Sequence, residues 1–210
     1  MSNLQLEAPA QGADVCSKTS TVTQRLGDAK RWKTALYDVL IWFLFGVLVT
    51  TMLRMYSPGY PILVGTPSIA MGVYWVDKTD HRYARGDYVS FDFEPQQTWL
   101  QGRYGHDLVH TKMVLGVAGD VVRADQDLNL TLCRRNVDGL ANSCVSAGKV
   151  FQKDSKGRPL YSWVPAGHKY TLRAGELWVF GTHPRSLDSR YHGPILAGAT
   201  HGKAQPLWLF

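Results

Sequence analysis

The stretch that decides the fold covers residues 35–53 and reads ALYDVLIWFLFGVLVTTML. Nineteen helical residues span about 28 Å, close to the hydrocarbon thickness of a bilayer. Asp38 is the only charged residue in the stretch, and it lies one turn from the start, where it can reach the interface. The stretch is apolar all round, whereas a buried helix of a soluble domain would show an amphipathic face. We therefore expect a transmembrane anchor over residues 35–54.

The flanking residues predict the orientation of this anchor. Three basic residues stand just before it: Lys30, Arg31 and Lys33. Arg54 alone follows it closely. By the positive-inside rule, residues 1–34 form a cytoplasmic tail, which is polar and expected to be mostly disordered. Residues 55–210 then lie across the membrane, in the periplasm of a bacterium. No small-residue cleavage site follows the apolar run, so we expect an uncleaved, single-pass anchor in the inner membrane.

Composition excludes several other classes of protein. The chain has 210 residues, 45% of them hydrophobic, and a net charge of +6, which leaves room for one domain beside the anchor. The slightly negative mean hydropathy argues against a protein with many membrane spans. The basic charge raises nucleic acid as a partner, but no lysine-rich run or cluster of basic and aromatic residues supports it. No nucleic-acid partner is expected.

The three cysteines divide between the two sides of the membrane. Cys16 falls in the tail, in a reducing compartment. Cys133 and Cys144 fall in an oxidising compartment, where we expect them to form a disulfide. A metal site on these two cysteines is disfavoured because no second pair and no ligand-spaced histidine accompany them.

The outer part of the chain is typical of β structure. Seven short runs are rich in β-branched or aromatic residues and are bounded by Gly, Pro or Asp. These predicted strands are Val73–Val76, Tyr88–Phe93, Leu108–Val117, Val121–Arg123, Leu128–Leu132, Glu176–Phe180 and Pro206–Leu209. No long stretch after residue 57 has a helical period. The predicted fold is mainly β: a small antiparallel β-domain behind a single transmembrane helix.

Four blocks in this outer domain could carry chemistry. They read GTPSIAMGVY (65–74), RGDYVSF (85–91), TKMVLGVAGDV (111–121) and GTHPRSLDSRYHGP (181–194). Ser68 in the first block is a candidate nucleophile, and such a hydroxyl needs a base to remove its proton. Lys112 in the third block begins an otherwise apolar run. Burial lowers the pKa of a lysine, and a lysine that is neutral near pH 7 is a competent general base.

In this order the blocks resemble the type I signal peptidases, the membrane serine peptidases of the S26 family that use a Ser/Lys dyad. The resemblance covers roughly residues 60–200, and its most specific match is SLDSRYHG at 186–193. Two features are similar to the TraF-like conjugal-transfer branch, which matures pilins: the motif Gly72-Val73-Tyr74 and the short chain. The chain departs from the family at three positions: Ala70 and Ala118 replace prolines, and Met113 replaces an arginine.

The resemblance implies a role for each site residue. Ser68 Oγ attacks the scissile carbonyl, and neutral Lys112 takes its proton and later protonates the leaving amine. The backbone N–H of Ser68 and the hydroxyl of Thr66 hold the oxyanion. The implied supporting residues are Ser186, Asp188 and Arg190. Ser186 orients the lysine, and Asp188 and Arg190 form an ion pair. A more direct role for Asp188 stays open. No cofactor is implied.

The expected function is that of a membrane-anchored serine endopeptidase of conjugative pilus maturation. It cleaves a signal peptide or a propilin at the outer face of the inner membrane, with head-to-tail closure of the pilin in some members of the branch. The expected partners are that substrate, the lipid bilayer and type IV secretion components. Two alternatives stay open: a general leader peptidase, and a non-catalytic scaffold of a pilus or secretion assembly. Metal hydrolysis by His106 and His110 is disfavoured, because this pair lacks a helical context and the usual glutamate; no metal is expected.

Overall fold

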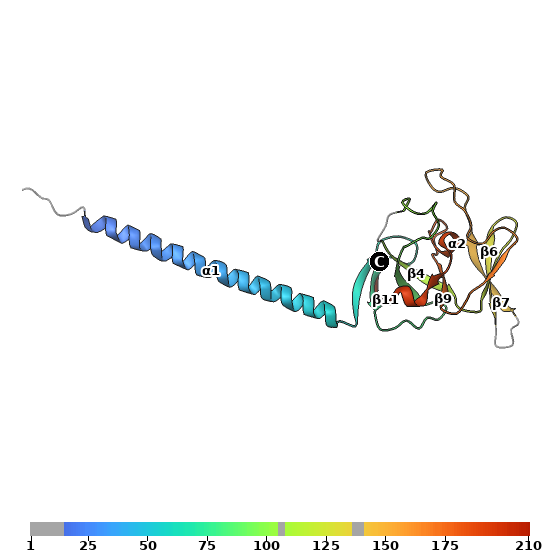
Figure 1. The fold of residues 1–210 in the computed structure, drawn as a ribbon, viewed down its shortest axis with the longest axis horizontal. Coiled ribbons are helices and arrows are strands. Elements are labelled where there is room, and N and C mark those ends of the chain that lie inside the picture. The colour runs from blue at the N-terminus through green and yellow to red at the C-terminus, as the bar shows by residue number, and fades with distance from the viewer. Residues whose placement is uncertain (1–14, 105–107, 136–140) are drawn as a thin grey trace, which may run out of the picture. The chain divides into compact units, whose positions relative to one another are not determined.

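The fold consists of one long helix and an antiparallel β unit. The computed structural model describes residues 15–104, 108–135 and 141–210. The chain divides into two compact units, the first ending at Tyr56 and the second beginning at Ser57. Helix α1 (Val15–Tyr56) accounts for the described part of the first unit, and the strands form the second (Figure 1). The prediction of a mainly β fold with an N-terminal helix is confirmed.

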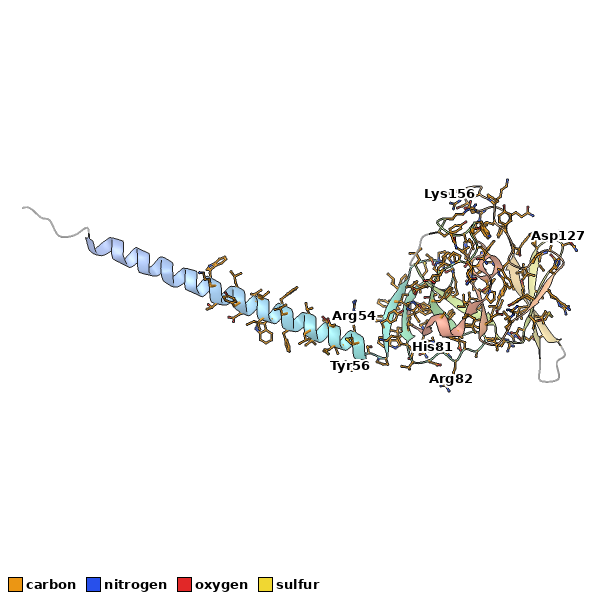
Figure 2. The ribbon with its side chains drawn as sticks, in the orientation of Figure 1. Arg54, Tyr56, His81, Arg82, Asp127 and Lys156 are labelled. Carbon is orange, nitrogen blue, oxygen red and sulfur yellow. A yellow bond between two sulfur atoms is a disulfide. The ribbon has the colours of Figure 1, made fainter. Side chains whose placement is uncertain are left out.

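Helix α1 contains the predicted anchor but begins well before it. Residues 32–56 form a segment long and apolar enough to cross a membrane. Its described apolar side chains point outward all round, as Figure 2 shows. Residues 15–34 are helical too, although we expected a mostly disordered tail there. They contain no proline and a single glycine, so a helix nucleated downstream continues through them. It ends at Tyr56, two residues before Pro58, which cannot continue a helix.

The β unit is built from two antiparallel sheets. The larger has seven strands in the order β1-β2-β11-β3-β4-β9-β10, and the smaller has four in the order β7-β6-β5-β8. The strands of the larger sheet are β1 (Gly59–Val64), β2 (Gly72–Asp77), β3 (Tyr88–Asp92), β4 (Val109–Gly116), β9 (Glu176–Phe180), β10 (Ile195–Leu196) and β11 (Thr200–Leu209). Those of the smaller are β5 (Val121–Ala124), β6 (Asn129–Arg135), β7 (Ala141–Lys149) and β8 (Lys169–Thr171). Helix α2 (Ser189–His192) and a 3₁₀ turn (Ala197–Ala199) lie between β9 and β11.

All seven predicted strands are present, and four further strands went unpredicted: β1, β7, β8 and β10. β1 contains Gly59 and Pro61, both of which are unfavourable inside a strand. The proline is tolerated because β1 lies at the edge of its sheet, where one side of the backbone needs no partner. β7 reads ANSCVSAGK and is too small and polar to show an alternating pattern.

The two sheets share a core that fixes the position of β9. Trp178 on β9 is fully buried in one cluster with Val122 and Leu132 of the smaller sheet. Burial of each such side chain contributes about 1.5–3 kcal/mol. Gly116 allows this close approach, since a Cβ there would come within 3.2 Å of Trp178 and collide with Leu132. The segment after β9, which carries the fourth sequence block, is thereby held against β4.

The predicted disulfide joins the two strands of one hairpin. Cys133 on β6 and Cys144 on β7 are direct partners in the strand register, and their sulfur atoms are bonded. Their Cα atoms are 4.0 Å apart. The bond crosses the end of the smaller sheet, and neither cysteine belongs to the segments that carry Ser68, Lys112 or Ser186.

Candidate active site

Ser68 lies in the turn between β1 and β2, and two neighbouring elements hold this turn. The backbone N–H of Thr182 donates to the carbonyl of Ser68 at 2.7 Å. Ile69, the next residue, is buried in a cluster with Tyr74, and the Tyr74 hydroxyl donates to the carbonyl of Ala70 at 2.8 Å. The side chain of Ser68 is itself buried, with its Oγ 3.2 Å from the hydroxyl of Thr66. The nucleophile candidate therefore sits on a rigid turn.

Two hydrogen-bond donors of this turn are placed to hold an oxyanion. The backbone N–H of Ser68 makes no hydrogen bond within the described parts of the chain. The hydroxyl of Thr66 already lies beside the attacking oxygen. Pro67, between them, has no N–H to offer. The turn thus supplies one main-chain and one side-chain donor near the point where charge would develop on a carbonyl oxygen.

Lys112 reaches the same region from the middle of β4. It pairs with Val89 of β3 in the register, and only 5% of its surface is exposed. Its Nζ donates a hydrogen bond to Ser186 Oγ at 3.0 Å. Burial lowers the pKa of Lys112 from 10.5 to about 8, with Asp188 opposing the shift and Arg190 adding to it. About a tenth of the lysine is therefore neutral at pH 7, far more than for an exposed lysine, and this fraction can accept a proton.

Gly181 brings the serine turn and the fourth block together. A Cβ at this position would collide with the side chain of Ser186 and would lie 3.0 Å from the carbonyl oxygen of Ser68. Both groups therefore approach the same face of Gly181, which is possible only because it has no side chain. The Ser68 hydroxyl bonds that of Thr66, and the Lys112 amine bonds the hydroxyl of Ser186. No direct hydrogen bond joins Ser68 to Lys112.

Asp188 and Arg190 form a buried ion pair that braces the loop behind Ser186. Both side chains are at most 1% exposed. Asp188 Oδ1 accepts from the backbone N–H and Nε of Arg190, and Oδ2 accepts from Nη2 of Arg190 and from the N–H of Gly181. Arg190 also donates to the carbonyls of Lys149, Pro184 and Ser186. The carboxylate is fully occupied as an acceptor, so its geometry suits a support and not a proton carrier.

An aromatic wall, formed by His110, Phe93 and His192, lies near Lys112. His110 precedes Lys112 by two residues on β4, so the two side chains share a face of the sheet. Its ring stacks on Phe93, with the ring centres 4.7 Å apart, and His192 meets the same phenylalanine edge to face. Burial lowers the pKa of His110 to about 4 and that of His192 to about 3, and the nearby Lys112 charge adds to both shifts. Both imidazoles are therefore neutral at physiological pH.

Most residues of this site, but not all of them, could be named from the sequence. The structure brings Thr66 to Ser68, Ser186 to Lys112, and Asp188 to Arg190. The positioning role of Gly181 and the Thr182 contact went unpredicted, although both residues open the fourth block. The wall formed by His110 and His192 also gave no sequence signal. His106, considered above as a metal ligand, lies outside the described residues.

These features define a class of protein. The chain belongs to the signal peptidase family, peptidase S26, whose sequence model matches residues 34–209. A curated relative points to one branch of that family: the conjugal transfer protein TraF of Agrobacterium fabrum (strain C58 / ATCC 33970). It is 30% identical over 164 residues, which cover 72% of this chain and 84% of that protein. The family predicted from the four blocks, and its closeness to TraF-like proteins, are confirmed.

Proposed function

We propose that this chain is a serine endopeptidase in which Ser68 is the nucleophile and Lys112 the general base. The observation that carries the proposal is the hydrogen bond between the buried Lys112 amine and Ser186, on a loop that also contacts the Ser68 turn. A buried amine with a lowered pKa, held by a loop that also contacts the Ser68 turn, suits activation of the Ser68 hydroxyl.

The reaction follows from these positions. Ser68 Oγ attacks the scissile carbonyl while its proton passes to neutral Lys112 Nζ. The Ser68 N–H and the Thr66 hydroxyl hold the oxyanion, and each such donor is typically worth about 10²–10³ in rate. The tetrahedral intermediate collapses to an acyl-enzyme, and Lys112 gives the proton to the departing amine. An attacking water, or a second amine, then releases the acyl group from Ser68.

A free strand edge beside Lys112 can receive the substrate. β3 pairs with β4 from Val109 to Met113, whereas β9 pairs with β4 only from Met113 onward. On the β9 side, residues 109–112 therefore face no described strand. An extended peptide that adds to this edge gains main-chain hydrogen bonds and runs alongside Lys112. Binding of this kind is largely independent of side chains, and it delivers a carbonyl group in a fixed orientation.

The apolar part of α1 supports a membrane location for the reaction. We place the enzyme in the inner membrane of a bacterium, with the β unit on the periplasmic side, because the basic residues cluster before the apolar segment. Two residues, Ser57 and Pro58, separate the end of α1 from β1. The Cys133–Cys144 disulfide suits an oxidising compartment. A substrate bond just outside a membrane-inserted segment fits such an enzyme.

The TraF relative supports a substrate of the conjugation apparatus. We propose that the substrate is a propilin, cut during maturation of a conjugative pilus in contact with type IV secretion components. Closure of the cut pilin into a ring would require an amine to reach the acyl-enzyme before water does. A positioned amine has this advantage, since effective molarities of well-oriented groups reach about 10⁵ M.

Co-expression with a candidate propilin tests the proposal. The chain, its Ser68→Ala and Lys112→Ala variants, and the exposed-residue controls Ser143→Ala and Lys169→Ala are compared by intact mass of the product. Processing is expected in the wild type and in both controls, and is expected to fall below detection in the two dyad variants. A product lighter by one water than the linear peptide shows ring closure.

Two other outcomes of this experiment decide against the proposal. Equal processing in all variants contradicts the dyad and favours a non-catalytic scaffold. The same co-expression is repeated with an unrelated secretory precursor. Equal cutting of that precursor and the propilin contradicts a dedicated propilin peptidase and favours a general leader peptidase.

A further inference from the structure

A small pocket lies beside the loop that carries Ser186. Its volume is about 110 Å³, enough for one side chain or a chain end. Apolar and aromatic residues form its floor, and two cations stand at its rim. These residues are Phe151, Leu160, Leu187, Tyr191, Lys153 and Arg185. No step of the proposed reaction uses this pocket.

Neither of the two cations at the rim pairs with an acid among the described residues. Arg185 and Lys153 are exposed. The guanidinium of Arg185 lies 5.7 Å from the ring centre of Phe151, which holds it over the pocket. Among the residues that the structure describes, no acceptor lies within hydrogen-bonding distance of the Arg185 guanidinium or the Lys153 ammonium. Both charges are therefore available to a ligand.

Asp154 is the one acid in the pocket lining, and its charge is already paired with that of Arg158. Its Oδ2 accepts from Arg158 at 2.6 Å and from the Tyr104 hydroxyl at 3.1 Å. Its Oδ1 accepts from the backbone N–H groups of Lys156 and Arg158, both at 2.9 Å. These hydrogen bonds hold the pKa of Asp154 below its usual range. Lys156 itself lies at the outer margin of the β unit (Figure 2), so it adds further positive charge to this side.

The pocket adjoins the loop that carries the hydrogen-bond partner of Lys112. Arg185 directly precedes Ser186, the hydrogen-bond partner of Lys112. In the proposed reaction Lys112 protonates the leaving amine, so the departing segment leaves along the side of this lysine and its loop. Adjacent Cα atoms are about 3.8 Å apart, and an extended peptide covers about 3.3 Å per residue. An extended departing chain of about five residues covers about 17 Å, which is long enough to reach Arg185 beside Ser186.

We infer that this pocket binds a carboxylate on the departing side of the cut bond, so that the enzyme prefers an acidic leaving segment. The carboxylate is either an Asp or Glu side chain or the free C-terminus of the substrate, within about five residues of the cut. Arg185 and Lys153 bind the charge, and the floor at Phe151 and Leu160 packs against the methylene groups next to it. This inference rests on the proposed function and adds a substrate preference to it.

Binding to a non-cleaving enzyme tests the pocket independently of catalysis. The full-length Ser68→Ala protein is placed in neutral phosphatidylcholine nanodiscs, which contribute no competing anionic lipid. Three alanine-rich hexapeptides are then compared by fluorescence anisotropy: one ends in an amidated Glu, one in an amidated Gln, and one in Gln with a free carboxylate. We expect the first and third to bind about fivefold to tenfold more tightly than the second, as a charge-assisted hydrogen bond implies. A preference for one of the two acids over the other identifies the source of the carboxylate.

Variants at the rim tie this preference to the pocket. Adding Arg185→Gln or Lys153→Gln to the Ser68→Ala protein is expected to reduce the preference to less than twofold, whereas the exposed control Lys169→Gln retains it. Equal binding of acidic and neutral peptides overturns the inference, as does a preference that survives Arg185→Gln.

Cleavage of a mixed peptide library by the wild-type enzyme shows on which side of the cut bond an acidic residue is preferred. Enrichment of acidic residues is expected after the cut bond and is expected to vanish in Arg185→Gln. Enrichment before the cut bond overturns the assignment to the departing side. If the wild type and Ser68→Ala proteins leave the library equally uncut, the proposed function fails, and the binding result still decides the pocket.

Discussion

The amine of Lys112 donates to the hydroxyl of Ser186 across 3.0 Å, although the two residues are 74 positions apart in the chain. Both side chains are at least nine-tenths buried. This hydrogen bond fixes the direction of a long and otherwise flexible amine, and it leaves the lone pair of the neutral lysine available to Ser68.

Removal of the Ser186 hydroxyl is expected to slow the reaction without abolishing it. In Ser186→Ala, Lys112 loses its fixed orientation, and we expect kcat to fall by about 10–100-fold, the scale of misplaced catalytic groups. Ser186→Thr keeps a hydroxyl and is expected to recover part of the rate. Peptide cleavage assays measure both variants, and an unchanged kcat in Ser186→Ala contradicts the orienting role.

The rate should rise with pH up to the pKa of Lys112. Burial lowers this pKa to about 8, and only the neutral amine accepts the serine proton. We expect kcat/KM to increase about tenfold per pH unit below about pH 8 and to level off above it. The measurement is kcat/KM from pH 6 to pH 10. A profile that is flat over this range rules out Lys112 as the base.

Replacement of Lys112 by methionine should stabilise the protein while removing its activity. The unfolded lysine binds its proton up to about pH 10.5, whereas the folded one releases it near pH 8. The buried charge therefore destabilises the wild type fully below pH 8, and this cost disappears as the pH rises from 8 to 10.5. We expect Lys112→Met to gain about 1–3 kcal/mol at pH 7 and less at pH 10. Thermal unfolding at both values tests this, with the exposed Lys169→Met as the control.

A methyl group at position 181 should disrupt the site. A Cβ at Gly181 collides with Ser186 and presses on the carbonyl of Ser68. Overpacking of this kind costs about 1–3 kcal/mol, and the displaced groups are the serine that orients Lys112 and the backbone that carries the proposed nucleophile. We expect Gly181→Ala to lose at least about 100-fold in kcat/KM. Gly198→Ala is the matched control, because a Cβ there meets nothing within 4 Å. Comparable activity in the two variants contradicts the positioning role of Gly181.

Loss of the Asp188 charge should damage the fold more than the chemistry. In Asp188→Asn the buried Arg190 keeps its charge without a partner, which costs about 3–5 kcal/mol. We expect a large drop in Tm, and no change in the pH at which the remaining activity levels off. If the fold is stable and the pH profile moves, Asp188 carries protons directly.

Reduction of the disulfide should weaken the smaller sheet and leave the site working. A bond that closes a short loop typically contributes about 2–4 kcal/mol. Cys133 and Cys144 lie on the β6–β7 hairpin, which carries none of the proposed reacting groups. We expect a lower Tm with reductant and an unchanged kcat/KM at 25 °C. Loss of activity without loss of structure contradicts this separation.

Different kinds of signal determined what could be predicted from the sequence. The apolar run at 35–53 and the alternating strands were predictable because burial and membrane insertion both depend on local patterns. Ser68 and Lys112 stood out because the order of the blocks around them is specific. Gly181 could not be assigned a role, since its lack of a side chain matters only where two distant segments meet. Edge strand β1 was hidden by a proline whose tolerance depends on having no neighbour on one side.

The proposed catalytic groups come from three segments that meet only in the finished sheet: the β1–β2 turn, the middle of β4 and the loop after β9. Before it folds, the chain holds an ordinary serine and a fully charged lysine, which do not form the proposed dyad. Completion of folding is therefore the activation step, and no inhibitory propeptide is needed for this purpose. In the proposed enzyme, the site is therefore inactive until the β unit has folded.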